Sequence, residues 1–174
     1  VSGTIVMFQV LPGMAIGMGL TVIIARCAGA GDFNQARYYT KKVISIVYVA
    51  QLISCVVVLA LLPSILNIYG LSESANAMVQ KNLWWHGIMM ILIWPLAYTL
   101  PITFRASGDA KFPMIVGVLT MFLCRIAFAF LLCRYFDFGM FGTWLAMFID
   151  WVVKAILFAH RYLNEKWTSY RAIA

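Results

Sequence analysis

Five long apolar stretches dominate this 174-residue sequence and limit what it can fold into. A helix needs about 20 mostly apolar residues to cross the hydrocarbon core of a bilayer, and each stretch is that long. A chain in lipid must satisfy its backbone hydrogen bonds internally, which continuous helices do. We therefore predict an all-α fold, a polytopic membrane bundle of about five transmembrane helices. The expected spans are Thr4–Ala28, Val43–Leu66, Leu83–Phe104, Phe112–Cys133 and Phe138–His160.

The composition supports a membrane protein and argues against a water-soluble one. Hydrophobic residues make up 64% of the chain and charged residues only 11%, whereas a soluble domain is typically about 45–50% apolar and about 25% charged. The formal net charge of +7 does not indicate nucleic acid, because the basic residues lie between the apolar runs rather than in one patch. The lipid bilayer is therefore the expected partner.

The basic residues are divided unequally between alternate links. Eight fall on one side and two, Lys81 and Arg134, on the other. Because cytoplasmic loops carry an excess of Lys and Arg, we predict a multi-pass protein of the cell inner (plasma) membrane with a cytoplasmic C-terminus. The eight residues of the predicted cytoplasmic side are Arg37, Lys41, Lys42, Arg105, Lys111, Arg161, Lys166 and Arg171.

Proline and glycine mark irregular helices in two of the spans. Pro12 lies in the first span beside Gly13 and Gly17, a small-xxx-small pair that either permits close helix packing or accompanies a bend lining a cavity. Pro95 and Pro101 predict a kink in the third span, since proline removes a backbone hydrogen bond. After the first span, Asp32 is placed to cap a short following helix, with Gln35 as the second residue of a capping box.

Three charged residues lie at membrane depth, where an unpaired charge is costly. Arg125 is twelve residues before Asp137 and Asp150 thirteen after it, so an antiparallel hairpin places both roughly 18 Å from the turn. They are therefore expected to pair, with Lys154, one turn beyond Asp150, as a competing partner. We predict an intramembrane ion pair drawn from these three residues, with either a structural role or a role in conformational switching.

The sequence contains no recognisable enzyme signature. It lacks a Walker loop, a GxSxG elbow, an HExxH pair and a Rossmann fingerprint, and its four cysteines show no metal-ligand spacing. We therefore expect no enzyme, no catalytic residues, no metal and no cofactor. Polar and aromatic residues at membrane depth, including Gln9, Trp94 and Tyr98, suit an amphiphilic cationic ligand through stacking and cation–π contacts, although each also suits ordinary packing.

Four ordered motifs resemble one family. They are GAGDFNQAR after the first span, FRASGDAKFPMIV between the third and fourth, FLCRIAFAFLL in the fourth and GTWLAMFIDWVVKAILFAHRY in the fifth. In order and spacing they are similar to the C-terminal half of a MATE (multidrug and toxic compound extrusion) transporter. The resemblance implies that residues 1–174 are a partial C-terminal transmembrane lobe, matching helices eight to twelve of a twelve-helix, two-lobe fold whose N-terminal lobe is missing here.

The resemblance also implies a function: a secondary-active antiporter that exports organic cations or other amphiphiles in exchange for H⁺ or Na⁺. Family members with a cation site in this lobe carry an acidic residue in the helix matching Leu83–Phe104, and this chain has none there. The coupling site is therefore expected outside the fragment, or the mechanism differs. The helices matching the first and third spans face the family's central cavity, so the resemblance indicates Gln9, His86, Met90, Trp94 and Tyr98 as cavity-lining residues.

Two alternatives stay open at the level of the sequence. The first is a flippase for lipid-linked saccharides from the same superfamily, which a cavity rich in basic residues would favour because such substrates carry phosphates. The second is a membrane-embedded enzyme or an assembly subunit. An enzyme should bring polar residues together at one depth, and the available pair, His86 and Asp150, are predicted at different depths. His86 itself is either a satisfied histidine or a titrating group beside a cavity.

Overall fold

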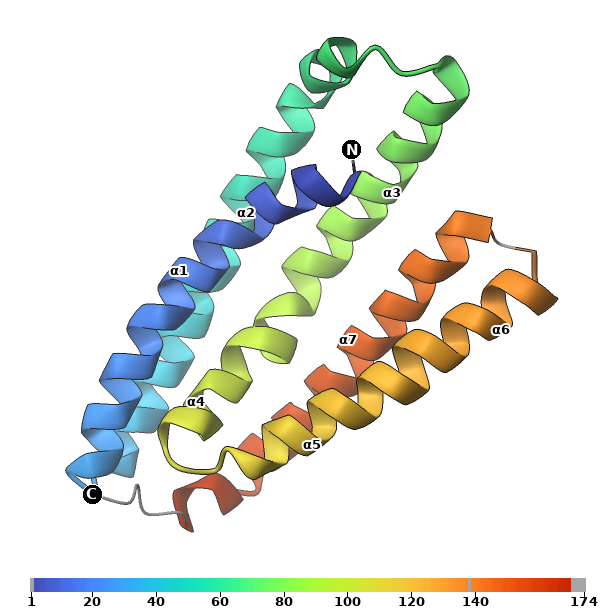
Figure 1. The fold of residues 1–174 in the computed structure, drawn as a ribbon. Helices are drawn as coiled ribbons and strands as arrows, with labels where there is room; N and C mark the ends of the chain where they lie inside the picture. Colours follow the sequence, from blue (N-terminus) through green and yellow to red (C-terminus); the bar gives the residue numbers. More distant parts are fainter. Residues whose placement is uncertain (1, 138, 170–174) are drawn as a thin grey trace.

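The computed structural model describes residues 2–137 and 139–169, which form helices joined by short turns, with no strand in these ranges (Figure 1). Helices α1 and α2 lie side by side, the bent segment α3–η1–α4 packs against them, and α5–α6 forms a hairpin with α7. The predicted all-α bundle is confirmed. The elements are α1 Ser2–Gly29, α2 Phe33–Tyr69, α3 Glu73–Leu92, η1 Pro95–Thr99, α4 Leu100–Ala106, α5 Lys111–Thr120, η2 Met121–Ala127, α6 Phe128–Tyr135, α7 Gly139–Leu163 and η3 Lys166–Ser169.

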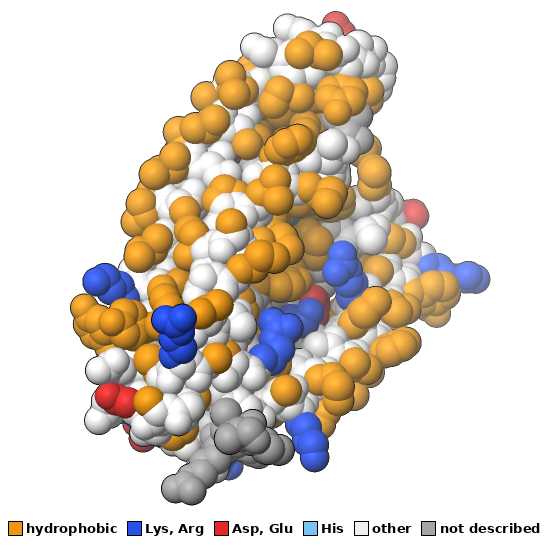
Figure 2. Space-filling model, turned by 60° about the vertical axis from the view of Figure 1, so that its left-hand side comes forward, with side chains coloured by type: hydrophobic (Ala, Val, Ile, Leu, Met, Phe, Trp, Pro, Cys, Tyr) orange, Lys and Arg blue, Asp and Glu red, His pale blue; other side chains and the backbone are white. Residues whose placement is uncertain are grey.

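Within the described ranges, four helical segments are long and apolar enough to cross a membrane, and a bent fifth segment meets the same test. The four are α1, α2, the continuous stretch Lys111–Tyr135 and α7. Their outward faces carry large apolar side chains such as Phe8, Val56 and Phe122, which cover most of the face seen in Figure 2. Such a surface requires lipid around it.

Helix α2 corrects one prediction. Asp32 does cap it, since its side chain accepts a hydrogen bond from the backbone N–H of Gln35 at 3.0 Å. The helix that begins there is not short, however. It continues without interruption through the second span as Phe33–Tyr69, because no glycine or proline separates the amphipathic start from the apolar run.

The third span is bent as predicted. The segments Glu73–Leu92 and Pro95–Ala106 meet at 57°. Pro95 cannot donate a backbone hydrogen bond to the preceding turn, and the chain continues from it as one turn of wide π-helix, Pro95–Thr99. A second π-helical stretch, Met121–Ala127, interrupts the fourth span. Both irregular stretches lie on the same side of the bundle as the pocket described below, where such geometry is often found.

The fourth and fifth spans form the expected antiparallel hairpin (Figure 1). The turn uses left-handed backbone at Asp137 (φ 52°) and Gly139 (φ 53°), and left-handed conformations favour Asp and Gly over other residues. The predicted first residue of the fifth span, Phe138, lies outside the described residues. The helix α7 begins at Gly139 and ends at Leu163.

Helix α1 is helical throughout Ser2–Gly29, including Pro12, so the glycines next to it serve close packing. A β-carbon on Gly13 would lie 2.5 Å from the Trp94 ring, and one on Gly17 would lie 2.7 Å from Ile102. Both distances are shorter than van der Waals contact. The small-xxx-small pair therefore lets α1 approach the bent third span.

The links alternate between two ends of the bundle, as the charge pattern predicts. At one end, an ion pair joins Arg37 to Glu165 at 2.9 Å and another joins Arg161 to Asp109 at 2.8 Å, which ties three links together. At the other end, Lys81 lies over the Phe141 ring. Arg171, assigned to the more basic end, lies outside the described residues. That this end faces the cytoplasm stays a prediction.

Candidate substrate pocket

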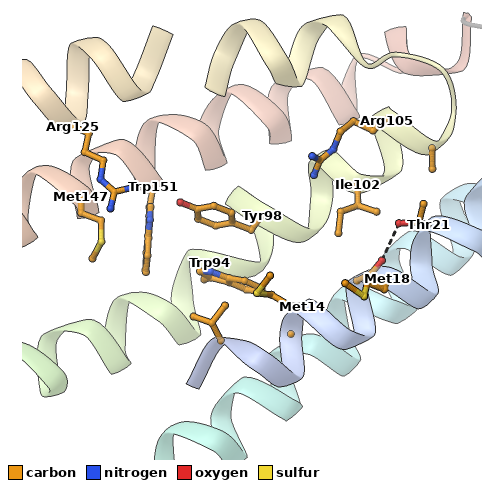
Figure 3. Close-up of a pocket in the computed structure, with 14 residues that line it drawn as sticks. Met14, Met18, Thr21, Trp94, Tyr98, Ile102, Arg105, Arg125, Met147 and Trp151 are labelled. Carbon is orange, nitrogen blue, oxygen red and sulfur yellow. Dashed lines mark hydrogen bonds between the residues drawn. The ribbon is translucent and has the colours of Figure 1, made fainter. Parts of the chain in front are cut away.

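A cavity of about 690 Å³ opens between α1, the bent third span and the hairpin of the fourth and fifth spans (Figure 3). Its volume is within the range of about 300–1,000 Å³ that is common for small-molecule sites. We refer to it as the aromatic pocket. It is lined by Val10, Gly13, Met14, Gly17, Met18, Thr21, Trp94, Tyr98, Ile102, Arg105, Ala106, Arg125, Met147 and Trp151.

Three aromatic rings form one wall of the pocket. Trp94 and Tyr98 are stacked with ring centroids 5.5 Å apart and planes at 19°, and Tyr98 meets Trp151 edge-on at 5.9 Å. The bend after Leu92 places Trp94 and Tyr98 on the inner side of the third span. Planar, amphipathic rings of this kind present a large apolar contact area to a flat ligand.

Methionines and glycines form the facing wall. Met14 and Met18 project from α1 toward the pocket and Met147 projects from α7 (Figure 3). Methionine is flexible and polarisable and adapts to ligands of different shape. Gly13 and Gly17 also line the pocket, where they let Trp94 and Ile102 of the bent third span pack closely against α1. The apolar lining therefore suits variable amphiphilic molecules.

The charged residues of the pocket are both arginines. Arg125 extends from η2 toward Met147 and Trp151, and Arg105 enters from α4 (Figure 3). No Asp or Glu is among the lining residues that the structure describes. Figure 2 shows basic side chains, with an acidic side chain among them, at the hollow in the face that is drawn. The pocket thus combines an aromatic floor with positive charge.

Two of the five predicted cavity residues, Trp94 and Tyr98, line the pocket, and three do not. Gln9, His86 and Met90 each have 0% exposure. The Nδ1 atom of His86 lies 3.1 Å from Oε1 of Gln9, and its ring packs edge-on against Trp144 and Trp151 at 5.7 and 5.4 Å. These three residues fill the buried space between α1, α3 and α7, where His86 of α3 contacts Gln9 of α1 and Trp144 and Trp151 of α7.

Of the two predicted partners of Asp150, Lys154 forms the intramembrane ion pair and Arg125 does not. Nζ of Lys154 lies 2.8 Å from Oδ2 of Asp150, whose side chain is fully buried. The expected pair between Arg125 and Asp150 is wrong: among the described residues Arg125 makes no ion pair. Lys154 is one turn from Asp150 on the same helix, which makes it the available partner. Arg125 instead extends into the pocket, and in η2 it is the neighbouring residue Cys124 that is buried.

Several pocket residues were not predicted from the sequence. Met14 and Met18 share a helical face with Gly13 and Gly17, so the glycine spacing is a signal that would have located them. Trp151 directly follows Asp150, and its position in the sequence carries no signal that its ring faces the pocket. Arg105 was assigned to a link because it precedes Ser107 and Gly108, and only the geometry of the bent span shows that its side chain reaches the pocket. Among the described residues, no His, Cys, Asp and Glu side chains gather as a metal site.

Comparison with known proteins places this architecture among membrane transporters. The MatE family model matches residues 1–131. The chain is 27% identical over 165 residues to the uncharacterized transporter YisQ of Bacillus subtilis (strain 168), covering 94% of this chain and 36% of that protein. It is 20% identical over 152 residues to the probable multidrug resistance protein YoeA of the same organism, covering 84% and 32% respectively.

A third relative matches a shorter segment. The probable multidrug resistance protein NorM of Thermotoga maritima is 30% identical over 63 residues, which is 36% of this chain and 14% of that protein. The chain thus spans about a third of the length of YisQ and YoeA. No solved structure matches the chain.

Proposed function

Since the chain belongs to the MatE family of multi-pass membrane transporters, we propose that it forms part of a secondary-active antiporter that exports amphiphilic small molecules in exchange for H⁺ or Na⁺. In this proposal the chain corresponds to helices eight to twelve, within the C-terminal lobe. A first lobe faces the aromatic pocket, and the two lobes rock to expose the pocket to each side of the membrane in turn.

One observation carries the proposal: a cavity of about 690 Å³, lined by stacked aromatic rings and methionines, opens between candidate membrane spans. Polar groups are few in its lining, which is the usual character of sites for small amphiphiles. The names of the relatives YoeA and NorM, both probable multidrug resistance proteins, support the same class of substrate.

The coupling ion needs a carboxylate that faces water in one state and is sequestered in the other. Asp150 is the acidic residue inside a span, and its carboxylate already pairs with Lys154. The remaining acidic residues, Asp32, Glu73, Asp109, Asp137 and Glu165, lie at or beyond helix ends. We therefore propose that the coupling carboxylate lies outside these 174 residues and that the pair of Asp150 and Lys154 is structural.

The proposal predicts gradient-driven efflux. Inverted vesicles carrying the complete transporter are placed in a solution of a fluorescent amphiphile, and an H⁺ or a Na⁺ gradient with the higher concentration in the lumen is then imposed. Export by the transporter is measured as uptake of the amphiphile into the vesicles. Transport that requires one of these gradients and that falls when both Trp94 and Tyr98 are replaced by alanine supports the proposal. Equal transport without any gradient, or a double variant that transports normally, contradicts it.

A second candidate, a flippase for lipid-linked saccharides, is favoured by one observation, the two arginines in the pocket. Such substrates carry phosphates, which arginine binds in a bidentate manner. The stacked rings and the methionines around the arginines fit a compact aromatic molecule better than a pair of long isoprenoid chains, and so we rank the flippase second.

A further inference from the structure

We propose that the aromatic pocket selects amphiphilic anions: flat aromatic molecules that carry a carboxylate, sulfonate or similar acidic group. The inference rests on the proposed transport function and assigns the sign of the substrate's charge. It differs from the sequence-based expectation of a cationic ligand, which rested on polar and aromatic residues at membrane depth and on the family resemblance, and did not include the two arginines.

The position of Arg125 carries the argument. It lies ten residues before the end of α6 and fourteen after the start of α5, which is about 15 and about 20 Å along the helix axis, near the middle of the span. A guanidinium at this depth is costly and is retained where it serves a pathway or a binding site. Its side chain is directed into the pocket (Figure 3), and none of the ion pairs among the described residues joins it to Asp150.

No described group neutralises the pocket's positive charge. Among the described residues, neither Arg125 nor Arg105 makes an ion pair, and Asp150, the nearest candidate along α7, is held by Lys154 at 2.8 Å. Lys154 also lies over the Tyr98 ring, 5.5 Å from its centroid, but its charge is balanced by Asp150, which leaves the two arginines as the charges that a ligand can meet. An anion is the ligand that satisfies these groups.

The aromatic wall defines the rest of the ligand. Trp94 and Tyr98 stack on each other and contribute apolar ring surface to the pocket lining, which suits the aromatic part of a ligand. Ring faces also attract cations, but a cation bound here would share the pocket with two guanidinium groups and no lining carboxylate, and like charges repel. Arg105 lies at the end of the bent span, close to the basic end of the bundle, where it is placed to draw an anion toward Arg125.

The test uses two dyes with the same xanthene ring system and opposite charge, fluorescein and rhodamine 6G. Each is titrated against the complete transporter in phosphatidylcholine nanodiscs, and fluorescence anisotropy reports binding. We expect fluorescein to bind more tightly. Arg125→Gln and Arg105→Gln should each weaken fluorescein about tenfold or more, the loss expected for a charge-assisted hydrogen bond, and should leave rhodamine 6G unchanged or tighter. Arg134→Gln, on the same span as Arg125 but outside the pocket, should change neither dye.

Each other result overturns the inference in a distinguishable way. Tighter binding of rhodamine 6G refutes the charge selectivity and leaves the transport proposal intact, whereas failure to bind either dye refutes both. Equal weakening of both dyes by Arg125→Gln shows that the arginine is structural. A last measurement repeats the titration in nanodiscs that contain one tenth phosphatidylglycerol. If fluorescein then no longer binds, either to the unchanged protein or to Arg134→Gln, a lipid head group occupies the pocket and the proposal of an aromatic ligand is wrong.

Discussion

The ion pair between Asp150 and Lys154 makes a quantitative prediction about stability. The Asp150 side chain is 0% exposed and that of Lys154 is 12% exposed, with 2.8 Å between the charged atoms. At an effective dielectric constant of about 20 the gross attraction is about 6 kcal/mol, much of which offsets the cost of removing the two charges from water. Lys154→Met removes the attraction and leaves the cost of burying Asp150. We expect it to destabilise the protein by about 3–5 kcal/mol.

A double variant separates this effect from the loss of the lysine side chain. Replacing both residues, as Asp150→Asn with Lys154→Met, removes the buried charge along with its partner. Replacing a whole buried pair is often close to neutral, so the double variant should recover at least about 2 kcal/mol relative to Lys154→Met, the size of coupling expected between contacting residues. Asp150→Asn alone should cost less than Lys154→Met, because the ammonium group of Lys154 also borders a cavity.

The assay is unfolding of the purified protein in mixed micelles with increasing SDS, followed by circular dichroism. Lys111→Met is the matched control, since Lys111 is exposed at the start of α5 and its replacement should change stability by no more than about 0.5 kcal/mol. If Lys154→Met unfolds at the same SDS fraction as Lys111→Met, Asp150 does not depend on Lys154 and the reasoning fails.

Two further substitutions test the packing and the basic end in the same SDS assay. Gly13→Ala places a β-carbon 2.5 Å from the Trp94 ring and should destabilise the protein by about 1–3 kcal/mol. The control Gly19→Ala, with nothing within 4 Å of the new β-carbon, should be neutral or stabilise the protein by up to about 1 kcal/mol. Equal effects of the two substitutions would contradict the close approach of α1 to the third span. Asp109→Asn weakens the two hydrogen bonds from Arg161 and should cost about 1.5–3 kcal/mol, and no loss would mean that this ion pair does not hold the links together.

The number, order and pairing of the helices could be predicted because the relevant signals are local. Each span is a long apolar run, Pro95 removes a hydrogen bond at the bend, and Asp137 with Gly139 forms the turn between two antiparallel helices. Where the prediction of α2 was wrong, the reason was also local. A polar, basic helical turn and an apolar one can continue in a single helix when no glycine or proline intervenes.

The pocket was harder to predict because its lining depends on the direction in which each helix face points. Trp94 and Tyr98 line the pocket, but His86 and Met90, about two turns and one turn before Trp94, face the buried interior, because the bend lies between them and Tyr98. The choice of Lys154 over Arg125 as the partner of Asp150 likewise depended on side-chain direction. Two residues at the same depth are equally plausible partners in a sequence argument, and the π-helical stretch that aims Arg125 into the pocket has no sequence signature.

The account depends on the helices crossing a bilayer so that the two ends of the bundle lie on opposite sides. Cysteine accessibility measures this directly, in a background where Cys27, Cys55, Cys124 and Cys133 are replaced. In intact cells a membrane-impermeant maleimide should label Ser74→Cys, in the first turn of α3. It should label Lys111→Cys, at the basic end, only after permeabilisation. Labelling of both positions in intact cells, or of neither until the membrane is opened, would contradict the arrangement.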